Sequence, residues 1–118
     1  MGIPTSNDRY ISLNVLLEAV GTAKTRYLHC PVNGSIVYIG CVTDVAVDGD
    51  NIVTGAINGT AITGGAFTVL ASGSAAGVKN QAVPTAANAV KRGDAISMAT
   101  DGGGSAGQLM VTVLIEQE

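Results

Sequence analysis

The closing stretch of the chain, residues 107–117, alternates strictly between apolar and mixed positions. One set of alternate positions is wholly apolar, and the other is half apolar. The first set is Leu109, Val111, Val113 and Ile115, and the second is Met110, Thr112, Leu114 and Glu116. A period of two is typical of a β-strand with one face in the core. Because the second face is half apolar, we expect it to be covered and not exposed to water.

The same reasoning predicts strands along most of the chain. Asn58-Gly59 between apolar runs indicates a tight hairpin, since a type I′ turn needs positive φ at both central positions. Thr63-Gly64-Gly65 predicts a second reversal directly after it. The expected strands are 9–20, 24–30, 35–47, 52–57, 60–62, 66–70, a short edge strand at 82–83, 95–100 and 107–117. Helical periodicity is not sustained anywhere.

These elements predict an all-β fold. We expect an antiparallel, jelly-roll-like β-sandwich or a small barrel of seven to nine strands. The length of 118 residues fits one domain. We expect an extended N-terminal arm over residues 1–8 and a single β-sandwich domain over 9–118. Neither a secretory signal nor a membrane-spanning run is expected from the hydropathy pattern.

Charge is scarce along the chain. Charged residues make up 13%, against about 25% in a typical globular protein. The stretch from Asn51 to Val78 carries no charge at all. The net charge of −3 and the scattered basic residues argue against a nucleic-acid-binding surface. Since uncharged edge strands invite pairing and interface cores are depleted in charge, we expect an oligomer that docks onto a larger assembly.

The two cysteines, Cys30 and Cys41, are expected to be free. If residues 32–34 form a turn between two strands, Cys30 pairs near Ile36 and Cys41 pairs near Thr25. The offset is then about five residues, or ~16 Å, which is too far for a disulfide. With one histidine in the chain, a tetrahedral zinc site is also excluded.

No set of residues predicts an enzyme. His29 and Cys30 are neighbours on one strand, so their side chains point to opposite faces. Asp94 and Asp101 fall at opposite ends of one strand, too far apart for paired carboxylate chemistry. Residues 102–104 are all glycine, but the Lys and the helix of a phosphate-binding loop are missing. We expect no catalytic residue, no cofactor and no metal. A calcium ion at residues 48–51 is the alternative to a plain turn there.

The turns of the second half carry a resemblance to a known family. They are Asn58-Gly59, the loop 72–77, Arg92-Gly93-Asp94 and the glycine-rich tip 101–104. With them, residues 27–118 resemble the small β-sandwich decoration (cement) proteins of tailed bacteriophages. The resemblance implies a homotrimer on the outer surface of the virion's capsid, bound to the major capsid protein where capsid subunits meet. It implies stabilisation of the head, with no nucleic acid and no membrane as partner.

The arm is the expected capsid-docking element. We expect the stretch from Ile3 to Tyr10 to reach the shell, with Ile3, Pro4, Arg9 and Tyr10 as its partner-binding residues. Two other roles stay open. One is a carbohydrate-binding or adhesion module, although the chain has no Trp to stack on sugars. The other is a structural component of the phage tail or fibre, which composition does not separate from a head protein.

Overall fold

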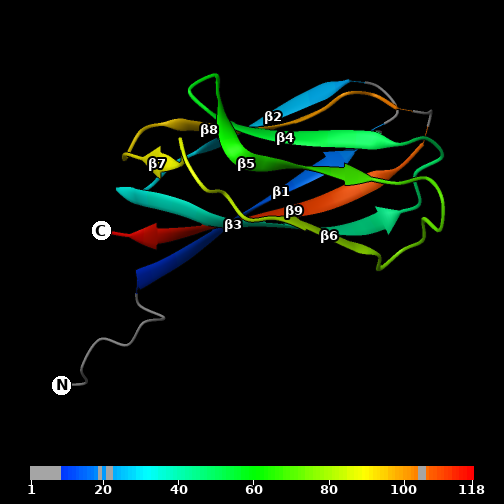
Figure 1. Ribbon diagram of the computed structural model, residues 1–118, viewed down its shortest axis with the longest axis horizontal. Helices are drawn as coiled ribbons and strands as arrows, with labels where there is room; N and C mark the ends of the chain where they lie inside the picture. Colours follow the sequence, from blue (N-terminus) through cyan, green and yellow to red (C-terminus); the bar gives the residue numbers. More distant parts are fainter. Residues whose placement is uncertain (1–8, 19, 21–22, 104–105) are drawn as a thin grey trace.

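The computed structural model describes residues 9–18, 20, 23–103 and 106–118, and this part of the chain is all-β (Figure 1). The predicted arm, residues 1–8, lies outside the described residues. The strands are β1 (Tyr10–Glu18), β2 (Lys24–His29), β3 (Gly34–Val45), β4 (Asn51–Ile57), β5 (Thr60–Val69), β6 (Lys79–Ala82), β7 (Ala89–Val90), β8 (Ala95–Thr100) and β9 (Gln108–Gln117). Among these residues, no helix is long and apolar enough to cross a membrane.

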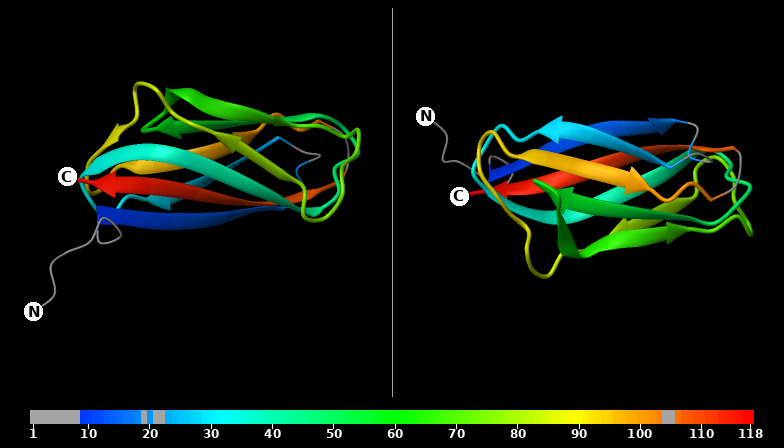
Figure 2. Two further views of the ribbon diagram at one scale, coloured as in Figure 1. Left: turned by 60° about the horizontal axis from the view of Figure 1, so that its bottom comes forward. Right: turned by 90° about the horizontal axis from the view of Figure 1, so that it is seen from above.

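The strands form two antiparallel sheets that face each other (Figure 2). Sheet A has the order β1-β9-β3-β6, and β7 also pairs with β3. Sheet B has the order β2-β8-β4-β5. The predicted antiparallel β-sandwich is therefore confirmed, in its sandwich form rather than as a closed barrel.

The pairing is nested about the hairpin at Asn58-Gly59. Moving outward from this turn, β4 pairs with β5, β3 with β6, β2 with β8 and β1 with β9. The chain is thus one long two-stranded ribbon wrapped across both sheets, which is the jelly-roll arrangement. At the turn itself, φ is 49° at Asn58 and 86° at Gly59, as a type I′ hairpin requires.

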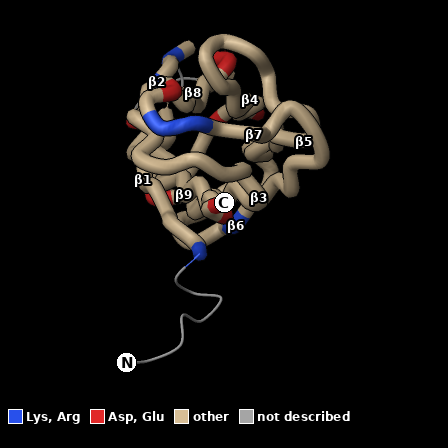
Figure 3. Tube along the Cα trace, turned by 90° about the vertical axis from the view of Figure 1, so that its left-hand side faces the viewer, with Lys and Arg blue, Asp and Glu red and all other residues tan. Residues whose placement is uncertain are grey.

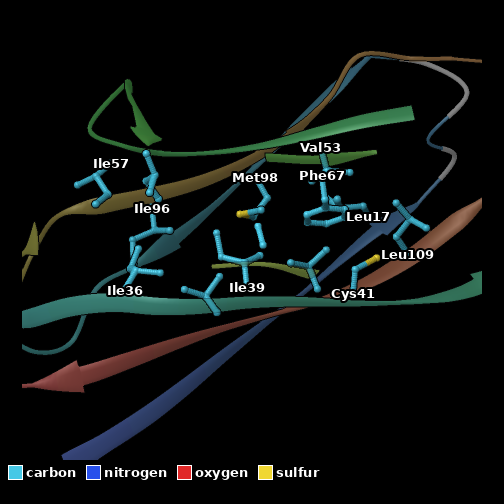
Figure 4. Packing of buried hydrophobic residues seen from close by; sticks show 14 of the residues in the cluster. Leu17, Ile36, Ile39, Cys41, Val53, Ile57, Phe67, Ile96, Met98 and Leu109 are labelled. Carbon is cyan, nitrogen blue, oxygen red and sulfur yellow. The ribbon is translucent and has the colours of Figure 1, made fainter. Parts of the chain in front are cut away.

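The core lies between the sheets and is built from aliphatic side chains (Figure 4). Both sheets contribute alternate positions, as the period of a strand requires. Its largest fully buried side chains include Leu17, Ile36, Ile39, Ile96, Met98, Leu109 and Ile115. On β9, the four predicted inward residues are all fully buried. The sequence interpretation of β9 is confirmed on that face.

The predicted reversal at Thr63-Gly64-Gly65 is wrong. Strand β5 runs through these residues without turning back. Its pairing with β4 shifts instead, because Thr54 faces Ala66 while Ala56 faces Ala61. The extra residues leave the ladder as a bulge, and Gly64 supplies the positive φ of 76° that the bulge needs. A glycine pair therefore marks a kink in one strand here.

The predicted hairpin at residues 32–34 is also wrong. Strand β2 pairs with β8 in sheet B, whereas β3 pairs with β9 in sheet A. The turn carries the chain from one sheet to the other, so its residues do not set a register between β2 and β3. Cys30 and Cys41 are nonetheless free and buried, as predicted.

The loop region after β5 holds more structure than expected. The predicted edge strand at 82–83 is displaced, because β6 ends at Ala82 and Val83 is exposed. It does lie at an edge, beside β3 in sheet A. The short strand β7 was not expected, because a two-residue strand has no detectable period.

Candidate interaction face

The two predicted anchors that the structure describes lie at the start of β1. A nitrogen of the Arg9 guanidinium lies 3.4 Å from Oε2 of Glu116, and the Tyr10 hydroxyl donates to the same oxygen at 3.3 Å. The Arg9 side chain is 61% exposed, so the ion pair is weak. Ile3 and Pro4, the other two predicted residues, lie outside the described residues. The structure thus ties Arg9 and Tyr10 to β9 while leaving them accessible.

The outward face of sheet A carries large apolar side chains in neighbouring rows. In one row, Met110 of β9 lies between Leu16 of β1 and Val42 of β3. In another row, Leu114 lies between Ser12 and Tyr38. We call this surface face A and define it by Leu16, Tyr38, Gly40, Val42, Met110, Thr112 and Leu114. It includes Met110, Thr112 and Leu114, the side of β9 that the alternation predicted to be covered, and it extends onto β1 and β3.

A shallow groove of about 440 Å³ runs over face A. Its floor is Gly40, and Tyr38, Val42 and Met110 stand around it. A Cβ atom at Gly40 would lie 2.8 Å from Cε2 of Tyr38, so the tyrosine ring lies across this glycine. Glycine at position 40 therefore leaves room for the Tyr38 ring to lie flat on β3.

The rim of the groove is polar and its centre is not. The Tyr38 hydroxyl donates to Oε1 of Gln81 at 2.9 Å, which holds the ring in place. The Thr112 hydroxyl donates to Oδ1 of Asn14 at 2.7 Å on the opposite side. Lys79 of β6 is the charged residue that lines the groove among the described residues. Apolar walls with a few polar groups at the rim suit an apolar side chain of a partner.

Charges gather toward the ends of the sandwich rather than over face A. Glu116 lies at one end with Arg9, and Asp44 accepts a hydrogen bond from Nε2 of Gln108 at 3.0 Å at the other. Figure 3, which looks onto the left end of Figure 1, shows segments of both charges at this end. The residues that define face A are all uncharged, and Lys79, opposite Val42, is a charge at its border.

The uncharged stretch from Asn51 to Val78 has a different explanation. It forms β4, β5 and the loop that follows. The free edge of β5 is partly paired, since Thr63 N–H donates to the carbonyl of Ala86 and Thr85 N–H donates to that of Thr63. A backbone segment, and not charge, thus protects part of this edge.

The polar residues considered for chemistry are used in structure. Asp48 accepts from the amide of Ala106 and Asp50 from that of Ala71, both with Oδ1, so this turn holds loops together. His29 is exposed while Cys30 is fully buried, as their alternation predicts. In the described ranges, no three His, Cys, Asp or Glu side chains could hold a metal ion together.

A second groove, of about 490 Å³, lies at the end of the sandwich beside Asp94. Its polar groups are already engaged. Asp94 accepts from Nδ2 of Asn58 at 3.0 Å and from the amide of Lys91 at 2.8 Å. These two hydrogen bonds, that from Asn58 first, lower the pKa of the Asp94 carboxyl. The network fastens the β4–β5 hairpin to the turn before β8.

Sequence reasoning found the part of face A that lies on β9. The alternation of β9 identified Met110 and Leu114, and the anchors at Arg9 and Tyr10 border the same face. It missed Tyr38, Gly40 and Val42, although they alternate along β3 in the same way. Their role depends on the register between β3 and β9, which one sequence does not contain.

Comparison with known proteins shows a fold that this chain shares with other structures, but it assigns no family. No known protein family matches the sequence, and no curated protein matches it either. PirA is similar in structure, with 11% identity and a TM-score of 0.51 over 86% of this chain and 92% of that chain. The catalytic unit of a GH87 α-1,3-glucanase from Streptomyces thermodiastaticus has 12% identity and a TM-score of 0.52 over 92% of this chain and 26% of that one.

A third structure, of Bacillus endospore appendages that form disulfide-linked pili, has 15% identity over 92% of this chain and 88% of that chain. Its TM-score of 0.47 is too low to establish a shared fold. At identities this low, the other two likenesses show a shared β-sandwich fold and nothing of function.

Proposed function

We propose that this protein is a structural subunit of a phage virion: a capsid decoration (cement) protein that works as a homotrimer. It binds the outer surface of a tailed-phage head, on the major capsid protein where subunits meet, and stabilises the shell. It performs no chemistry and needs no cofactor. The resemblance of the turns in residues 27–118 suggests the class, and face A is the observation that carries the self-association.

The energetic argument starts from face A. Leu16, Val42 and Met110 form one continuous apolar row on a sheet whose other side is already packed. Val42 is 44% exposed and Met110 is 41% exposed. Burying apolar area contributes about 25 cal/mol per Å², so covering this row favours association. A trimer then presents three copies of each weak contact to the shell, which raises the overall affinity.

The arm is the proposed link to the shell. Arg9 and Tyr10, which follow the predicted arm directly in sequence, contact Glu116 at the start of β1. Deleting residues 2–8 should weaken binding to expanded heads at least about tenfold and leave the β-sheet circular dichroism spectrum unchanged, because the deleted residues precede the sandwich. Co-sedimentation with heads and circular dichroism measure the two effects. Unchanged head binding by the deletion variant would rule out the arm.

Electron microscopy of intact particles tests the location. Density for this protein on the outside of the head supports the proposal, whereas density on the tail or fibre replaces it with the other virion role. Light scattering of the purified protein tests the trimer, through a mass of three 11.8 kDa chains.

A carbohydrate-binding or adhesion role is the second candidate, and one observation favours it. The Tyr38 ring and the Gln81 amide stand together at the groove, as an aromatic and a polar group do in sugar sites. A glycan array separates the two roles. Specific sugar binding that Tyr38→Ala removes would favour adhesion over decoration.

A further inference from the structure

The groove on face A is a shaped receptor for a small apolar group. Tyr38, Val42 and Met110 line it, and the Tyr38 ring lies over Gly40 beside them. The Tyr38 ring is held by its hydrogen bond to Gln81, so one wall is set before anything binds. Such a groove fits one or two side chains of an extended segment and not a flat surface.

The chain itself contains a segment of matching chemistry. Between Gly2 and Asp8, the apolar residues are Ile3 and Pro4, and the others are small or polar. Proline favours an extended backbone at the residue before it, so Ile3 is biased toward the conformation of a bound strand. Proline also packs well on tyrosine rings in grooves that bind extended peptides.

Length allows this segment to reach a groove. Ile3 precedes Tyr10 by seven positions, and an extended chain covers about 3.3 Å per residue, or roughly 23 Å. On its own sheet, Gly40 shares a row with Thr112 and Asn14, four positions along β1 from Tyr10. That row is ~13 Å along the strand and ~10 Å across two strands from Tyr10.

The direction of strand β1 favours contact with the groove of another copy over the groove of the same chain. Strand β1 runs from Tyr10 toward the row of Asn14, so a segment before Tyr10 would have to run back along β1 to reach the groove of its own chain. Reaching that groove requires a reversal at Arg9, whose guanidinium contacts Glu116. A groove on a second copy imposes no such reversal.

We propose that Ile3 and Pro4 of one copy seat in the face A groove of a second copy, between Tyr38, Val42 and Met110. This contact is heterologous, because the segment and the groove are different surfaces, and three such contacts can close a ring. The inference rests on the self-association in the proposed function and supplies its mechanism. It leaves Arg9 and Tyr10, which remain on the surface, for contact with the shell.

Mixed disulfide trapping tests the contact. Each of two variants carries one added cysteine, Ile3→Cys in the first and Val42→Cys in the second. The native thiols are buried, so gentle oxidation acts on the added ones. Mixing the variants should give an Ile3–Val42 cross-linked peptide by mass spectrometry, at least about tenfold above a control mixture of Ile3→Cys with Ile52→Cys. Ile52 is a matched control, 47% exposed on sheet B.

Each outcome has a defined meaning. A cross-link between the mixed variants, which Met110→Glu in the Val42→Cys chain reduces at least tenfold, supports the proposal. A third variant carries both Ile3→Cys and Val42→Cys, and a cross-link within this chain, with none between the mixed variants, overturns the proposal in favour of a folded-back segment. No cross-link, with a wild-type trimer by light scattering, overturns the groove contact and leaves the proposed function standing. A wild-type monomer that does not bind heads overturns both.

Discussion

The two outward faces of this sandwich are both poor in charge, yet they differ in side-chain size. Face A displays Leu16, Met110 and Val42 in one row. The outward face of sheet B carries mostly small side chains: Thr25, Thr54, Ala56, Ala66, Ser97 and Ala99. Its exposed large apolar side chains, Tyr27 and Ile52, lie in rows separated by that of Thr25, Ala99 and Thr54. Apolar area that is continuous, as on face A, is better suited to burial than the same area in separate pieces. A shortage of charge alone therefore does not identify an interface.

The largest effect is expected from a change of backbone space in sheet A. A Cβ atom at Gly34 would overlap the carbonyl oxygen of Glu116 on the neighbouring strand. Gly34→Ala should lower the free energy of unfolding by about 3 kcal/mol, because β3 and β9 must separate. Urea unfolding followed by circular dichroism measures this loss.

The matched substitution on the sheet B side is Gly59→Ala. Its Cβ would meet no atom within 4 Å, but φ is 86°. The expected loss is about 1 kcal/mol, from backbone conformation alone. Equal losses for the two alanine variants would show that the Gly34 contact relaxes freely.

The second effect compares the two faces directly. A charge in the centre of face A should block self-association, so Met110→Glu should raise the dissociation constant of the assembly by more than about 100-fold. Ile52→Glu on sheet B should change it by less than about threefold. Sedimentation velocity over a concentration series measures both constants. The reverse order would move the interface to sheet B.

The third effect concerns the layer beneath face A. Burial raises the pKa of the Cys41 thiol to about 11. At pH 8 its thiolate fraction is then about 100-fold below that of an exposed thiol, and alkylation by iodoacetamide should be slower by at least that factor. The exposed thiol of an Ile52→Cys variant provides the reference, with mass spectrometry as readout. Rapid labelling of Cys41 would mean that sheet A opens locally.

The smallest effect is expected at Asp94, at the end of sheet B. Because the fold lowers the pKa of this carboxyl, its contribution to stability is complete above the unfolded value of about 3.9. It is lost as the pH falls through the lower pKa of the folded state. Asp94→Asn should flatten the fall of the melting temperature at acid pH. Identical melting curves from pH 2 to pH 6 would assign the acid sensitivity to other carboxyls.

Local patterns predicted the strands well and their partners poorly. The alternation of Leu109 to Ile115 and the turn at Asn58-Gly59 depend on neighbours in sequence, and both predictions are confirmed. The turn at Gly64-Gly65 was misassigned because two glycines suit a bulge as well as a reversal. The turn before Gly34 was misassigned because nothing local says whether the chain returns to the same sheet.

The candidate site shows the same division. The residues of face A on β9 were predicted from the alternation of that strand alone. The groove was not, because it needs Gly40 of β3 to stand beside Thr112 of β9, a register set by the whole sandwich. A sequence pattern therefore predicts which side chains share one face of a strand, but not the groove that neighbouring strands form together.

The nested ribbon has a consequence for how the molecule assembles. Among the described strand pairs, β4 and β5 are joined by a two-residue turn, and each pair further out is separated by a longer stretch of sequence. The entropic cost of closing such long loops slows folding, and it is largest for the outermost pair, β1 and β9. During that interval the exposed border of β9 can accept β1 from another newly made chain, so crowded synthesis should favour swapped dimers over lone molecules.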